Sequence, residues 1–252
     1  MPLPCRPSLF RVRPTLLAAA VLALTACGPS PEEQRAAAEA AAAAREAAMA
    51  PNLQVYRDAR ARGDARIAVA SAEVILADGP GTAAAIEVSE GLDALREAAK
   101  TQVETERLKA LWSYVSTPIA GESSPQKAAS MRNQRPEADD PASFAVVPTV
   151  QLVLRNDPRW GQSVYLVIEE GVFECGRPCA FNITLDEAAP KRFAGEASST
   201  GTRPALFIKD DAGFIRALDA ASTVRIAPVD GRADPIDFEV GGFDIGRYQA
   251  GG

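Results

Sequence analysis

The spacing of apolar residues changes at Pro148, and this change limits the folds open to the chain. From Pro31 to about residue 115, apolar residues recur three and four positions apart or give way to alanine, which is typical of helices. After Pro148 they alternate with polar residues, as in Val150, Leu152 and Leu154. Such alternation is typical of antiparallel strands with one buried face. The pattern therefore predicts an α+β protein with helices first and a sheet second.

The helical part is predicted to contain a stalk and a helical hairpin region. Residues 27–51 form the stalk, because eleven alanines lie between residues 36 and 50 and alanine is the best helix former. Pro51 marks a break, and residues 52–115 form an antiparallel helical region: a first helix that Asn52 caps and that ends near Gly63, and two more over about 64–77 and 82–115.

The apolar stripe of the helix over 64–77 contains Ile67, Ala70, Val74 and Ile75. Ala68 and Pro80 are spaced as in the second helix of a tetratricopeptide repeat, which this segment resembles. Tyr56, however, stands where that family has glycine, and the chain holds no second copy of the repeat. A plain helical hairpin is therefore the favoured interpretation.

Residues 116–148 contain five prolines and are predicted to form an irregular linker. Residues 149–249 are predicted to form a mainly antiparallel β-sandwich or barrel. One helix, capped by Asp211, covers it with an apolar face of Phe214, Ile215 and Leu218. The glycines of residues 241–248 predict a bulged closing strand at an edge, a position where a partner strand can add. The strand candidates are residues 150–154, 164–168, 181–185, 206–208, 224–226 and 236–240.

The absence of histidine from all 252 residues closes several routes to catalysis. It excludes Ser-His-Asp and Cys-His arrangements, HExxH zinc sites and the imidazole general base. The chain has 27 Lys plus Arg against 33 Asp plus Glu, and an acidic protein is a poor candidate for nucleic acid. We expect no cofactor and no metal.

Two other patterns could support hydrolysis. The acidic pairs Glu169–Glu170, Asp139–Asp140 and Asp210–Asp211 could supply the two carboxylates of a glycosidase. Ser124 and Lys127 match the SxxK pattern of β-lactamases and penicillin-binding proteins. The acidic pairs are poor candidates, however, because neighbouring side chains on a strand point to opposite faces. The SxxK pattern is a poor candidate because its companion motifs, SDN and KTG, are absent from the chain. Surface acids and a chance match are favoured, so the chain is predicted not to be an enzyme.

The N-terminus has the layout of a signal peptide. Residues 1–14 carry three arginines and no acid, and Thr15–Ala26 is an apolar run too short to span a bilayer. Its end, Leu24, Thr25, Ala26 and Cys27, resembles the bacterial lipobox. That resemblance implies removal of residues 1–26, a diacylglycerol thioether on Cys27 and commonly acylation of the new N-terminus. An ordinary signal peptide that happens to meet a cysteine is the alternative.

The residue after Cys27 and the remaining cysteines extend this interpretation. Gly28 rather than Asp follows the lipobox cysteine, which by the same resemblance favours the inner leaflet of the outer membrane, facing the periplasm. Removal of Cys5 and lipid on Cys27 leave Cys175 and Cys179 as a pair in an oxidising compartment. We predict a structural disulfide across a hairpin, because a redox motif favours two intervening residues and a metal site needs more ligands.

The C-terminal hundred residues resemble small β domains of uncharacterised envelope lipoproteins and periplasmic accessory proteins of type VI secretion. Neither resemblance implies a catalytic residue or a ligand. We predict a non-enzymatic envelope lipoprotein, held to the membrane by lipid on Cys27, that binds a protein or cell-envelope partner. A periplasmic inhibitor or immunity lipoprotein against a wall-degrading toxin is the alternative, and a histidine-free hydrolase acting on peptidoglycan is a third hypothesis.

Overall fold

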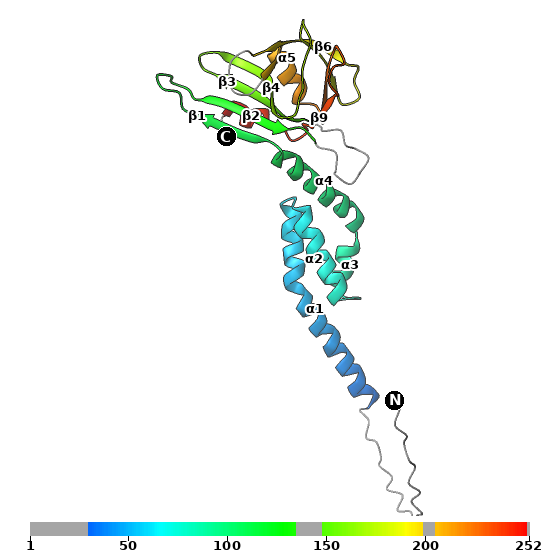
Figure 1. The fold of residues 1–252 in the computed structure, drawn as a ribbon. Helices are drawn as coiled ribbons and strands as arrows, with labels where there is room; N and C mark the ends of the chain where they lie inside the picture. The colour runs from blue at the N-terminus through cyan, green and yellow to red at the C-terminus, as the bar shows by residue number, and fades with distance from the viewer. Residues whose placement is uncertain (1–29, 135–147, 199–204, 251–252) are drawn as a thin grey trace, which may run out of the picture. The chain divides into compact units, whose positions relative to one another are not determined.

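The computed structural model describes residues 30–134, 148–198 and 205–250 (Figure 1). The chain divides into two compact units, residues 1–48 and residues 49–252. Leu24, Thr25, Ala26 and Cys27 lie outside the described residues, as do Asp139 and Asp140.

Helix α1 (Pro31–Ala61) begins in the first unit and continues into the second. Ser30 and Glu33 form a capping box, in which the Ser30 N–H donates to Glu33 Oε2 (2.7 Å) and the Glu33 N–H to Ser30 Oγ (3.2 Å). Nearly every residue between 31 and 48 is exposed, because alanine offers no large apolar face. The predicted alanine-rich helix is therefore present.

The predicted break at Pro51 is wrong, because α1 runs through this proline. A proline inside a helix removes one hydrogen bond and costs about 3 kcal/mol. Here it is flanked by Met49, Tyr56 and Ala59, which are buried in the helical core. The packing of these side chains offsets the cost and keeps the helix continuous.

Three further helices complete the helical part of the second unit: α2 (Ala65–Asp78), α3 (Ala83–Ser89) and α4 (Leu92–Ala110). Asp64 caps α2 by accepting from the Ile67 N–H (3.1 Å), and Thr82 caps α3 by accepting from the Ala85 N–H (3.1 Å). The single helix predicted over 82–115 is divided at Gly91, whose φ of 73° lies in the left-handed region that favours glycine.

The apolar stripe predicted for α2 is confirmed at Ile75 and wrong at Ile67, Ala70 and Val74, which are exposed. Ile67 and Val74 are 44% and 42% exposed, whereas Ala68 and Ala72 are completely buried beside Ile75. Helix α2 packs against both α3 and α4. We infer that small side chains occupy the contact face because neighbouring helices approach closely there.

The sheet is antiparallel throughout its described length, and its strands follow the order β1-β2-β3-β4-β7-β6-β5-β8-β9. It is one open sheet, so the predicted closure into a barrel is not found. The strands are β1 (Ser113–Thr117), β2 (Gln126–Arg132), β3 (Thr149–Asp157), β4 (Gly161–Glu170), β5 (Ala180–Leu185), β6 (Lys191–Ala197), β7 (Ala205–Ile208), β8 (Thr223–Pro228) and β9 (Ile236–Glu239).

One face of the sheet carries the core. Leu166 of β4 lies opposite Leu152 of β3 and Leu206 of β7, and all three are buried. The predicted alternation of core and surface positions is confirmed. Helix α5 (Asp211–Leu218) packs Phe214, Ile215 and Leu218 into the same core, as predicted, but its cap is Asp210 rather than Asp211.

The predicted irregular linker over 116–148 is wrong for its described part, because most of the β1–β2 hairpin lies there. Only Ala129 and Met131 of β2 are buried, and they are surrounded by serine, alanine and lysine. This composition hides the alternation that marks the other strands. The β part therefore begins at Ser113, before the predicted boundary.

The closing strand predicted over 241–248 is also wrong. After β9 the chain turns at Gly241 and Gly242 and forms the short helix α6 (Ile245–Ala250). A side chain on Gly242 would overlap the backbone of Leu108, so glycine here permits close approach to the end of α4. The Trp112 Nε1–H donates to the Val240 carbonyl at 3.3 Å, which ties this turn to the start of β1.

Candidate functional site

An open hollow of about 1070 Å³ lies beside the segment that joins β4 to β5. The segment starts after Glu170 and contains both cysteines of the predicted disulfide. The hollow is lined by parts of β4, β6 and β7 and by Arg232. Its lining residues are Ile168, Gly171, Val172, Phe173, Glu174, Cys175, Gly176, Arg177, Pro178, Cys179, Gly195, Glu196, Ala197, Leu206 and Arg232.

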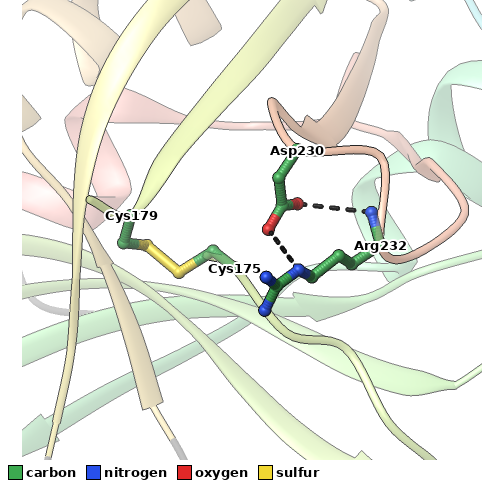
Figure 2. Close-up of a disulfide and its surroundings, with 4 residues drawn as sticks. All are labelled: Cys175, Cys179, Asp230 and Arg232. Carbon is green, nitrogen blue, oxygen red and sulfur yellow. Dashed lines mark hydrogen bonds and ion pairs between the residues drawn. A yellow bond between two sulfur atoms is a disulfide. The ribbon is translucent and has the colours of Figure 1, made fainter. Parts of the chain in front are cut away.

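Cys175 and Cys179 are disulfide-bonded, with their Cα atoms 5.0 Å apart (Figure 2). Their predicted position across a hairpin is wrong, because β7 and β6 lie between β4 and β5 in the sheet. The disulfide therefore closes a small loop within a connection between two strands that are not neighbours.

Phe173 anchors the same connection to the core of the β part. Its side chain is 3% exposed, and its ring stacks parallel to that of Phe181 on β5, with centroids 6.4 Å apart. Gly195 of β6 faces this assembly, and a Cβ there would meet Cys179 Sγ and the Phe181 ring. The missing side chain thus allows the disulfide to lie against β6.

A charged pair borders the disulfide on a loop that follows β8 (Figure 2). Arg232 Nε lies 3.3 Å from Asp230 Oδ2, and the Arg232 N–H donates to Asp230 Oδ1 (3.3 Å). The Asp230 carboxylate also lies over Gly176, where a Cβ would overlap it. The loop after β8 is thereby positioned next to the disulfide loop.

This arrangement suits binding. Phe173 and Leu206 are buried apolar residues of the lining, and the exposed Glu174, Arg177 and Arg232 supply charges of both signs. The volume of about 1070 Å³ is at the upper end of the range of ligand pockets, and the lining of this open hollow mixes apolar side chains with charged ones. No hydroxyl or amine nucleophile is present among the described residues that line the hollow.

The other candidates for chemistry have structural partners. Glu169 forms an ion pair with Arg132 at 2.8 Å, and Glu170 accepts from Thr149 Oγ1 at 3.2 Å. Lys127 of the SxxK pattern donates through Nζ to the carbonyl of Gln249. Asp210 accepts from the Gly213 N–H at the start of α5 (3.2 Å), where it serves as the cap.

Two polar side chains in the β part, Asn133 and Asp186, form hydrogen bonds to the backbone that the sequence does not predict. The buried Asn133 accepts from the Val150 N–H (2.8 Å) and donates to the Pro148 carbonyl (3.0 Å). Asp186 accepts from the N–H groups of Ser222 (2.9 Å) and Thr223 (2.8 Å). The hydrogen bond from Thr223 is the main cause that lowers the pKa of the Asp186 carboxyl. The residues next to Asn133 and Asp186 in the sequence form no recognisable motif, so the sequence alone does not indicate either role.

Within the described part of the chain, no group of three or more histidine, cysteine or acidic residues could hold a metal ion. No helix found there is long and apolar enough to cross a membrane. Comparison with known proteins finds no matching protein family, no similar curated protein and no similar solved structure. The resemblances to lipoproteins and to tetratricopeptide repeats therefore stay predictions.

Proposed function

We propose that the chain is a bacterial envelope lipoprotein, anchored by lipid on Cys27, whose β part binds a protein or envelope partner at the hollow beside the disulfide. The observation that carries this proposal is the lipobox-like run from Leu24 to Cys27, followed almost at once by an exposed alanine-rich helix. Neither membrane anchoring nor partner binding requires catalysis.

The exposed part of α1 fits a spacer between a lipid anchor and a folded body. At a rise of 1.5 Å per residue, residues 31–48 extend over about 27 Å. Their side chains are mostly alanine, with Glu39, Arg45 and Glu46 for solubility. Such a helix has no large apolar face that must be buried, so it can remain helical while exposed to solvent.

The disulfide fits the same compartment. Disulfides persist in the oxidising envelope and are rare in the cytosol. Cys175 and Cys179 pair with each other, so lipidation of Cys27 and removal of Cys5 leave no unpaired thiol in the mature chain. The thiol count therefore agrees with export and anchoring.

Anchoring is tested by membrane fractionation of the parent chain, Cys27→Ser and the matched control Cys5→Ser. We expect the parent and Cys5→Ser to remain in the membrane fraction and Cys27→Ser to be released into the soluble periplasm. Membrane retention of a Cys27→Ser chain from which residues 1–26 have been removed would contradict the anchor, because no helix among the described residues is long and apolar enough to cross a membrane.

Partner binding is tested by a photo-crosslinking residue at Val172, which is 71% exposed at the rim of the hollow. The matched control is Ile86 on α3, which is 61% exposed. We expect a discrete adduct from Val172 that is absent from Ile86 and lost in Arg177→Glu. Identical adducts at both positions, or cleavage of peptidoglycan by the purified chain, would contradict a binding role for the hollow.

A further inference from the structure

The open sheet has two edges, β1 and β9, and they are protected unequally. At β9 the Gln134 N–H donates to the Asp237 carbonyl at 3.0 Å, so part of that edge already has a partner. Glu239 forms an ion pair with Arg107 on α4 at 2.7 Å. Charged side chains and covering segments of this kind are among the ways in which sheet edges avoid further pairing.

Strand β1 has none of these protections. Its sequence, Ser-Tyr-Val-Ser-Thr, contains no charge and no proline, and Val115 at its centre is 51% exposed. Alternate residues of an edge strand turn their N–H and C=O groups outward. Among the described residues, no backbone hydrogen bond reaches the outer side of β1.

One face of β1 is nevertheless held firmly. The Tyr114 hydroxyl accepts from the Asp244 N–H at 2.7 Å, and the Arg247 guanidinium lies 4.6 Å from the centre of the Tyr114 ring. Ser113, Val115 and Thr117 alternate with Tyr114 and so share the opposite face. The edge is therefore pre-ordered, which lowers the entropy lost when another strand pairs with it.

We propose that β1 pairs antiparallel with β1 of a second copy of this chain, across a two-fold axis at Val115. An antiparallel pair of identical edges matches every outward donor with an acceptor. The protected β9 edge blocks a β1–β9 contact that would propagate into filaments, so the assembly closes as a dimer. In this register Ser113 lies opposite Thr117 of the second copy, and no like charges meet.

The interface is small, because five residues on each side bury less than the 1,200 Å² or so of a standard interface. The dimer is therefore weak, and the test must trap it. Directly opposite residues of an antiparallel pair have Cβ atoms about 4.5–5.5 Å apart, which is near the reach of a disulfide. Val115→Cys should thus cross-link to itself.

The experiment uses the full chain in a Cys5→Ser/Cys27→Ser background, in which the Cys175–Cys179 disulfide holds the only native cysteines. Val115→Cys is oxidised with copper phenanthroline and compared with Val74→Cys, an exposed valine on α2. We expect Val115→Cys to form covalent dimer at least about ten times faster. Equal rates at the two positions overturn the proposal.

Charge pairs at the ends of the strand test the register. With Val115→Cys in place, Ser113→Lys/Thr117→Lys sets like charges opposite each other and should suppress the cross-link at an unchanged melting temperature. Ser113→Lys/Thr117→Glu should restore it. Cross-linking that persists in the first variant, or is not restored in the second, overturns the pairing. The lipid plays no part here, so failure leaves the proposed anchoring untouched.

Discussion

Phe173 should hold the connection beside the hollow more strongly than the disulfide does. The connection has two attachments, the buried Phe173 ring and the Cys175–Cys179 bond. We compare Phe173→Ala with Cys175→Ser/Cys179→Ser, which removes the covalent link and keeps residues of similar size. Each change deletes one attachment and leaves the other.

The magnitudes follow from the structure. The disulfide closes a loop with a sequence separation of 4, for which the chain-entropy model gives roughly 2 kcal/mol. Phe173 is 3% exposed and stacked on Phe181, and removing such a ring from a core costs about 3–5 kcal/mol. The free energy of unfolding should therefore fall more in Phe173→Ala than in the double serine variant.

Tryptophan fluorescence in urea measures this directly. Of the two tryptophans, Trp112 is buried in the core of the β part and Trp160 is 78% exposed, so Trp160→Phe leaves Trp112 as the reporter. At a slope of about 2 kcal/mol per M urea, the midpoint should fall by about 1 M without the disulfide and by about 2 M without Phe173. A larger loss in the double serine variant would refute the reasoning.

Three further changes have predictable effects. Asn133→Leu leaves a buried backbone N–H of β3 unpaired and should cost about 1–3 kcal/mol in urea unfolding, so an unchanged midpoint contradicts that role. Gly242→Ala forces a Cβ into the backbone of Leu108 and should lower the free energy of unfolding by about 1–3 kcal/mol, so an unchanged melting temperature contradicts that close approach. Asp186→Asn should destabilise the chain at pH 7, because hydrogen bonds lower the pKa of this carboxyl in the folded state. That difference should vanish as the pH falls below the usual value of 3.8 and through the folded pKa, and a difference that persists in acid contradicts it.

The alternation of apolar residues predicted the central strands because they bury one face. Val150, Leu152 and Leu154 occupy the core side of β3, and Phe214 and Leu218 show the helical spacing of α5. Large aliphatic and aromatic side chains carry this signal. Where they form the core, the element and its buried face could be predicted from the sequence.

Small core residues gave no such signal. Ala129 is completely buried on β2, and Ala68 and Ala72 are completely buried on α2, yet alanine is equally at home on an exposed helix. The apolar pattern therefore assigns residues 113–115 to a helix and the rest of the β1–β2 hairpin to a linker, and it places the exposed Val74 in the core of α2. Pro51 predicts a break because proline is a local helix breaker, but α1 continues through it beside the buried Met49 and Tyr56.

The sequence predicts the disulfide of the candidate site but not the segments that surround it. The spacing of Cys175 and Cys179 indicated a disulfide, because the pair stands alone once the N-terminal cysteines are assigned. Arg232 reaches the same hollow from a loop more than 50 residues away. The strand order β4-β7-β6-β5-β8 brings these segments together, and periodicity within each strand carries no information about that order.

The central claim is the lipid on Cys27, and intact mass spectrometry of the chain purified from membranes tests it most directly. We predict a mature protein that begins at Cys27 and carries the added mass of a diacylglycerol and an N-terminal acyl chain, which proteolysis assigns to the peptide of residues 27–35. A chain that keeps residues 1–26, or that begins at Cys27 with no added mass, would contradict the account.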